Sequence, residues 1–159
     1  MTKKEFVLDT FRRYGKVTAQ AIQEKADTMT SAELYKEIAF IPPFHAALAK
    51  CNMLKRTKGF VCVSPQGNIV KLNQPYDSDI YTEEPEKLTA QWGFKWSTDP
   101  RKAKPFFKSA ESPYGVDECC IWEGGIYAST MKDNTYSPAE YPQGWRFVCL
   151  VEELAEEVE

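Results

Sequence analysis

Residues 114–130 read YGVDECCIWEGGIYAST, and this stretch decides the fold. Two short β-prone runs flank the Glu-Gly-Gly segment at 123–125, and glycine supplies the positive φ that a tight hairpin turn needs. We therefore predict a β-hairpin with its turn at Gly124. Beyond Thr130 the chain carries two prolines, a glycine and three aromatic residues up to Trp145, a composition that favours a rigid loop over a regular element.

The order of aromatic residues around this hairpin is its most specific feature. One aromatic residue opens the stretch, one stands before the turn, one follows it, an aromatic-x-Pro segment comes next, and a tryptophan closes it. The positions are Tyr114, Trp122, Gly124, Tyr127, Tyr136 with Pro138, and Trp145. This pattern resembles carbohydrate-binding module family 5/12, which is also called chitin-binding type 3.

The resemblance implies a small antiparallel β module that binds an N-acetylated polysaccharide, such as chitin or a peptidoglycan-like glycan, and catalyses no reaction. It also implies that Tyr136 is the exposed ring that stacks on a sugar. The loop from Asp133 to Trp145 is similar to the version of this module found in bacteriophage tail and baseplate proteins. The implied function is recognition of a host cell wall by a phage or prophage tail protein, located in the virion or in the bacterial cytoplasm.

Two alternatives stay open beside this function. The chain could be a structural component of a phage tail that binds no sugar, in which case the β modules are packing domains and the helices an assembly device. It could also be an accessory domain of a secreted chitinase. We see no signal peptide, because Asp9 interrupts the apolar part of the N-terminal stretch, and this counts against the chitinase alternative.

The physical reason for singling out aromatic side chains is their electron-rich face, which can stack on the polarised C–H face of a sugar ring. The candidate binding residues are Tyr136, Trp122, Tyr127, Tyr141 and Tyr81. Packing in the core is the competing interpretation for each ring. Tyr127 alternates with Ile126 on a short strand, which leaves both interpretations open. Trp145 precedes a strand-like run, and we predict that it lies in the core.

The chain contains a second, weaker copy of the same unit. An alignment at an offset of 57 residues, followed by a longer loop, preserves the order of its landmarks. The aligned pairs are Cys62 with Cys119, Gly67 with Gly124, Tyr81 with Tyr136, Trp92 with Trp145 and Phe94 with Phe147. We interpret this as a duplication. Because most aromatic positions are replaced in the first copy, Tyr81 is its one remaining candidate for sugar binding.

Helix signals fill the N-terminal part of the chain. Thr2 and Glu5 form a capping box, and apolar residues then recur at a spacing of three to four, which predicts a helix over residues 3–14 that ends at Gly15. Narrow apolar stripes need a partner, either the β part or further copies of the chain. Copies would make the protein a homo-oligomer that associates through residues 3–40.

Further helix signals follow. Thr18 is expected to cap a second helix, and Thr30 with Glu33 forms another capping box. The sequence does not decide whether residues 27–31 break the helix. Two prolines at 42–43 are expected to end the helical region.

The predicted fold class is α+β. A helical segment over residues 1–43 precedes a degenerate β module over 44–96 and an intact one over 97–148, whose core spans 114–148. An acidic tail over 149–159 is expected to be a short terminal helix or disordered.

Composition and motifs exclude several classes of function. The net charge of −3 and the lack of a basic stripe argue against a nucleic-acid partner, and no apolar run is long enough for a membrane span. The five cysteines lack CxxC spacing, and His45 is the only histidine. A calcium loop starting at Asp77 fails because Thr82 stands where glycine is required. We therefore expect no catalytic residues, no metal site, no cofactor and no enzyme.

Overall fold

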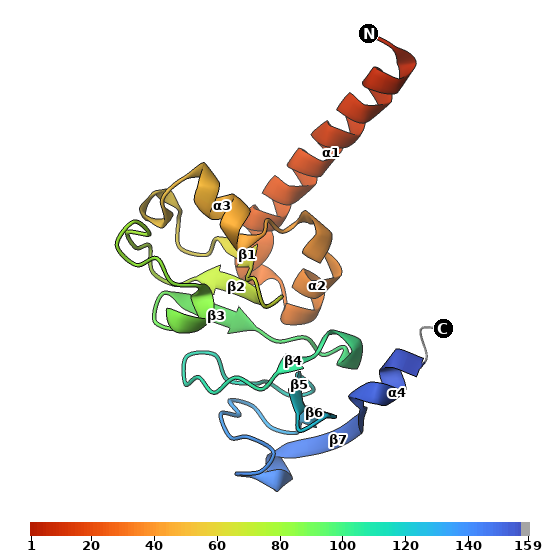
Figure 1. The fold of residues 1–159 in the computed structure, drawn as a ribbon, viewed down its shortest axis with the longest axis vertical. Coiled ribbons are helices and arrows are strands. Elements are labelled where there is room, and N and C mark those ends of the chain that lie inside the picture. Colours follow the sequence, from red (N-terminus) through yellow and green to blue (C-terminus); the bar gives the residue numbers. More distant parts are fainter. Residues whose placement is uncertain (157–159) are drawn as a thin grey trace.

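The structure is a computed structural model that describes residues 1–156. The fold is α+β, as predicted: a long N-terminal helix stands on a body in which two β-sheets follow one another along the long axis (Figure 1). The first sheet has the strand order β1-β2-β3, and the second has the order β4-β5-β6-β7. The N-terminus lies at the free end of the long helix, far from the second sheet.

Within residues 1–156, three α-helices precede the strands along the chain, and a fourth follows the last strand. The helices are α1 (Lys3–Lys25), α2 (Ser31–Lys36), α3 (Phe44–Lys50) and α4 (Val151–Glu156). The strands of the first sheet are β1 (Val61–Val63), β2 (Ile69–Leu72) and β3 (Trp92–Lys95). Those of the second sheet are β4 (Lys104–Pro105), β5 (Cys119–Trp122), β6 (Gly125–Ser129) and β7 (Trp145–Leu150). All neighbouring strands are antiparallel except β4 and β5.

Helix α1 begins where the sequence predicts but continues to Lys25. The capping box is present, because Thr2 Oγ1 accepts a hydrogen bond from the Glu5 backbone and the Glu5 carboxylate accepts one from the Thr2 backbone at 2.6 Å. The predicted stop at Gly15 and cap at Thr18 are wrong, since both residues lie inside the helix. A glycine in an exposed helix costs only about 0.5–1 kcal/mol, which a continuous hydrogen-bond ladder tolerates.

The segment after α1 resolves the break that the sequence left open. A single 3₁₀ turn at Ala26–Thr28 ends α1, and the predicted capping box of Thr30 and Glu33 opens α2. The expectation that the helical region ends at residues 42–43 is wrong. Pro43 instead stands directly before α3, a position where its missing N–H leaves no helical hydrogen bond unmade.

The two sheets contain a similar three-stranded meander, except that the β6–β7 pairing has a register shift at Ile126/Tyr127 that the β2–β3 pairing lacks. In the first sheet Val70 pairs with Phe94, and two residues further along β2 Leu72 pairs with Trp92. In the second sheet the corresponding pairs are Tyr127 with Phe147 and Ser129 with Trp145. The aligned tryptophans and phenylalanines therefore occupy equivalent positions on the third strand of each meander. This correspondence supports the interpretation of a duplication.

The turns before the middle strands differ in length. Glu123 and Gly124 form a two-residue turn in which both φ angles are positive, 48° and 78°, as the predicted tight hairpin requires. The first sheet has a longer turn, with Gly67 at a φ of 86°. The first sheet has one residue more between the paired residues Cys62 and Val70 than the second has between Cys120 and Tyr127. Cys62 therefore corresponds to Cys120, and the gapless alignment of Cys62 with Cys119 is wrong.

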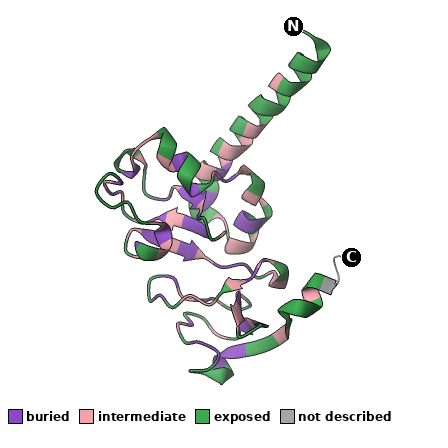
Figure 2. Ribbon diagram, in the orientation of Figure 1, coloured by how far each residue is buried: buried purple, intermediate pink, exposed green. Residues whose placement is uncertain are grey.

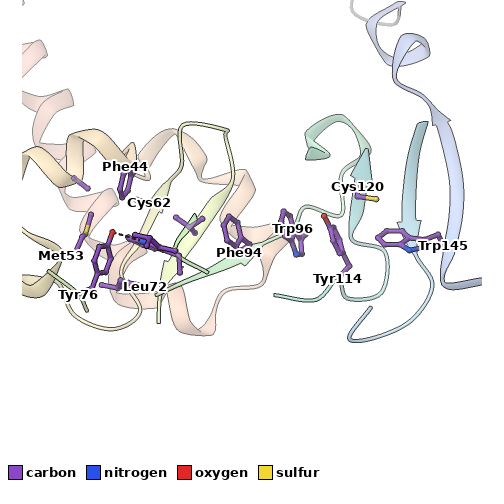
Figure 3. Close-up of a cluster of buried hydrophobic side chains, with 14 residues drawn as sticks. Phe44, Met53, Cys62, Leu72, Tyr76, Phe94, Trp96, Tyr114, Cys120 and Trp145 are labelled. Atoms are coloured by element: carbon purple, nitrogen blue, oxygen red, sulfur yellow. Dashed lines mark hydrogen bonds between the residues drawn. The ribbon is translucent and has the colours of Figure 1, made fainter. Parts of the chain in front are cut away.

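One hydrophobic core joins both sheets. Buried residues of the first sheet, such as Phe94, and of the second, such as Trp145, belong to a single cluster (Figure 3). At the junction Trp96 stacks on Tyr114 with ring centroids 4.6 Å apart and an interplanar angle of 12°. Phe107 packs on Phe94 at 4.7 Å. A boundary drawn at residue 97 therefore passes through a continuous aromatic core.

The two remaining clusters lie on the outer faces of the sheets. Val61 and Ile69 pack with Ile22 and Leu34 of the helices, so the first sheet is buried on both faces. The outer face of the second sheet is covered in part by Leu154 of α4. The predicted acidic tail thus begins within β7 and continues as a helix over Val151–Glu156, and residues 157–159 lie outside the described part of the chain.

Candidate functional site

Two of the predicted binding residues form an exposed pair on the loop between β6 and β7. The side chains of Tyr136 and Tyr141 are 48% and 41% exposed, and their ring centroids lie 5.7 Å apart at an interplanar angle of 52°. Because the rings are tilted and not coplanar, they form a shallow aromatic corner on which one or two sugar rings could stack.

The loop that carries this pair is fixed by a buried asparagine. Asn134 is fully buried, and its side chain donates to the Gly144 carbonyl at 2.9 Å and to Ser129 Oγ at 3.1 Å. Its side-chain oxygen accepts from the backbone N–H of Tyr136 at 3.1 Å. The backbones of Asn134 and Tyr114 exchange two hydrogen bonds of 2.9 Å. One side chain thus ties the start, the middle and the end of the loop together.

Trp145 is a second residue that fixes the loop. Its side chain is buried, as predicted, and the indole Nε1 donates to the Tyr136 carbonyl at 2.8 Å. Gly144 allows Tyr141 to approach closely, because a Cβ at that position would lie 2.8 Å from the Tyr141 ring. The hydroxyl of Ser137 also accepts a hydrogen bond from the Glu140 backbone within the loop. The backbone beneath the exposed rings is therefore well supported.

Trp122 and Tyr127 lie around the hairpin and are half-buried. Trp122 meets Phe106 edge to face at a centroid distance of 5.7 Å, and Tyr127 meets Phe147 at 5.5 Å and 70°. Both rings therefore combine core contact with partial exposure. The candidate residues of the second sheet therefore fall into two groups. The loop pair is Tyr136 and Tyr141, and the hairpin group is Trp122 and Tyr127.

Phe147 belongs to the hairpin group, although the sequence analysis aligned it without proposing a role. Its side chain is 53% exposed. The alternation of β7 could have identified it, because Phe147 stands two residues after Trp145 and so on the same face of the strand. Its exposure depends on what covers the sheet, which the alternation does not reveal.

Tyr81 lies in the connection between β2 and β3 of the first sheet, whereas the β6–β7 loop belongs to the second sheet (Figure 1). Its side chain is exposed, as is that of its neighbour Ile80. The backbone N–H of Tyr81 donates to the Asp77 carbonyl at 2.9 Å. The structure thus places Tyr81 apart from the four candidates of the second sheet.

The two cysteine thiols of the hairpin, Cys119 and Cys120, are buried and are poor nucleophiles. Burial raises the pKa of Cys119 to about 11 and the pKa of Cys120 to about 12. Both thiols are therefore protonated near neutral pH, and a thiol is a poor nucleophile. Among residues 1–156 the side chains of His, Cys, Asp and Glu form no group of three that could hold a metal ion.

Comparison with protein-family models, with curated proteins and with solved structures finds no match for this chain. The resemblance to a carbohydrate-binding module therefore rests on the residue pattern alone. Across residues 1–156, no helix combines the length and the apolar character that a membrane crossing needs.

Proposed function

We propose that this protein is a non-catalytic carbohydrate-binding protein that stacks an N-acetylated glycan on Tyr136 and Tyr141. Trp122 and Tyr127 support the site from the hairpin. The biological role that we propose is recognition of a cell-wall polysaccharide by a tail-associated protein of a phage or prophage, present in the virion or in the cytoplasm of the bacterium that makes it.

The observation that carries this proposal is the exposed tyrosine pair on a loop whose backbone is internally hydrogen-bonded. Two aromatic rings that lie side by side and are each nearly half exposed form a small surface on which a sugar ring can stack. The contacts of Asn134 and Trp145 fix the backbone before any ligand arrives. Such pre-organisation lowers the entropic cost of binding.

The site is small, and its affinity should be correspondingly weak. We expect a Kd on the order of 10 μM to 1 mM, which corresponds to roughly 4–7 kcal/mol. Binding of this strength becomes useful on a polymer surface when several copies of the site act together.

Retention on insoluble chitin, on peptidoglycan sacculi and on a neutral polysaccharide tests the proposal. The wild-type protein should be retained on at least one N-acetylated polymer, and Tyr136→Ala should abolish retention. The melting temperature of the variant should stay close to that of the wild type, because the removed ring is exposed. If Tyr136→Ala is retained as well as the wild type, or if it unfolds, the tyrosine pair is not the site.

The second candidate function is that of a structural component that assembles a phage tail without binding sugar. Helix α1 favours it, because the part of this helix beyond the body exposes apolar side chains. Retention of the wild-type protein on none of the three polymers would favour this function over carbohydrate binding.

A further inference from the structure

The free end of helix α1 exposes a series of large apolar side chains. We call residues 3–17 the helix tip. Its large apolar side chains are between 45% and 68% exposed, and they are Phe6, Val7, Leu8, Phe11, Tyr14 and Val17. Figure 2 shows that the helix tip is almost entirely exposed. Helix α1 meets the body at Tyr14, whose ring centroid lies 6.4 Å from that of Phe40, and its buried residue is Ile22.

The exposed area is large enough for a specific interface. An aromatic side chain can bury about 150–250 Å², so the three exposed rings of the helix tip alone offer several hundred Å². The exposed aliphatic side chains bring this close to the roughly 800 Å² per partner of a standard protein interface. Single monomeric proteins rarely expose a contiguous apolar patch of this size.

Most charges of the helix tip lie away from its apolar side; the exceptions are Lys3 and Lys4 in the first turn, which fall within it at 100° per residue. Arg12, Arg13, Lys16 and the two acidic residues Glu5 and Asp9 follow the opposite side of the helix, where Arg13 and Asp9 form an ion pair of 2.9 Å. Identical helices that meet along one side bring like charges together, which is unfavourable. Between residues 5 and 17 the apolar side carries no charge, so copies of this helix can meet there without repulsion.

The apolar side is also wide. At 100° per residue the positions from Phe6 through Phe11 to Leu8 span roughly 200° of the helix circumference. A two-stranded coiled coil needs only a narrow seam. One partner helix cannot cover so wide a side, whereas two or more partners can.

We propose that copies of this chain associate through the helix tip into a bundle of at least three helices. The inference is independent of the proposed glycan site, which lies on the second sheet. The sequence predicted association through residues 3–40. The interface that we propose is confined to the helix tip, because Ile22 and the helices that follow pack on the first sheet of their own chain.

A membrane surface is the competing partner, since the helix tip carries five basic residues against two acidic ones. Geometry disfavours it. The apolar side of the helix tip continues along α1 to Ile22, where the body covers it. A flat bilayer laid along this side would meet the body, whereas helices that pack only beside the helix tip would not.

Light scattering after gel filtration of the full chain tests the proposal. The wild type should have the mass of three or more chains at high micromolar concentration, and Phe11→Glu should have the mass of one. Lys16→Glu is the matched control, because Lys16 lies opposite the middle of the apolar side and this variant should assemble like the wild type. A wild-type mass of one or two chains, or an assembled Phe11→Glu, would overturn the bundle.

Two further measurements keep the result interpretable. The melting temperature of the Phe11→Glu body should match that of Lys16→Glu, because Phe11 is exposed beyond the body and its loss cannot unfold the sheets. Co-sedimentation with vesicles of equal parts phosphatidylcholine and phosphatidylglycerol should show no binding of the wild type. Binding to vesicles by a monomeric wild type would assign the helix tip to a membrane surface and contradict the bundle.

Discussion

The first and second sheets place aromatic residues at equivalent positions, yet they expose them to different degrees. Phe94 on β3 is buried, whereas Phe147 at the same position on β7 is 53% exposed. Val70 on β2 is fully buried, and its counterpart Tyr127 on β6 is half-buried.

The difference comes from what covers each sheet. The inner face of the first sheet packs against Phe44 of α3 and against Tyr76, whose hydroxyl accepts a hydrogen bond from Trp92 Nε1 at 3.1 Å. In the described part of the chain only the 3₁₀ turn Pro100–Lys102 and the short strand β4 lie between β3 and β5, and no α-helix there plays the part of α3. Equivalent strand positions therefore lie in a closed core in the first sheet and on a partly exposed aromatic surface in the second.

The largest predicted effect follows from the shared core. Trp92→Ala and Trp145→Ala should each destabilise the protein by about 3–5 kcal/mol, because each removes a buried indole and leaves a cavity. Thermal unfolding of both variants, followed by calorimetry, should show a single transition, since one cluster contains both rings. Two separate transitions, with each variant shifting only one of them, would show instead that the sheets are independent modules.

A smaller effect is expected at Asn134, which has no bonded equivalent in the first sheet's long connection. Asn134→Ala should cost about 1–3 kcal/mol, because buried groups of the loop lose their partners. It should also weaken glycan retention, since the tyrosine pair loses its support. Denaturant unfolding and the retention assay measure the two effects. The exposed residue Lys132 lies in the same loop, and Lys132→Ala should change neither.

The smallest effect concerns Glu118, which lies between the helices and the second sheet. Burial raises the pKa of Glu118, although a hydrogen bond from the Gly115 backbone, a hydrogen bond with Ser31 and the charge of Lys95 act in the opposite direction. The folded state therefore keeps this proton at a pH where the unfolded chain has released it. This contribution to stability is present at low pH and is lost as the pH rises through the folded pKa.

Glu118→Gln removes that dependence. The stability of this variant relative to the wild type should increase between pH 4 and pH 7, as measured by denaturant unfolding at each pH. A relative stability that falls over this range would mean that the hydrogen bonds and Lys95, and not burial, dominate at Glu118.

The parts of the fold that the sequence predicts correctly depend on local signals. The turn at Gly124 needs a positive φ, and the capping boxes that begin at Thr2 and Thr30 need only residues three positions apart. The burial of Trp145 follows from the strand beside it. Each of these features is determined within a few residues of the chain.

The parts that the sequence does not predict depend on contacts between distant residues or on their absence. Gly15 does not stop α1, and the helix continues through it to Lys25. Pro43 does not end the helical region, because Phe44 at the start of α3 packs on Trp92 in the first sheet at a centroid distance of 6.0 Å. The exposure of Phe147 likewise depends on the missing cover of its sheet.

The most direct test of the comparison between the sheets is a calorimetric titration with a soluble chito-oligosaccharide. We compare the wild type with two matched variants, Tyr81→Ala in the first sheet's loop and Tyr136→Ala in the second's. The wild type and Tyr81→Ala should bind with the same Kd, on the order of 10 μM to 1 mM, and Tyr136→Ala should show no binding. Loss of binding in Tyr81→Ala with binding retained in Tyr136→Ala would contradict the assignment of the site to the second sheet.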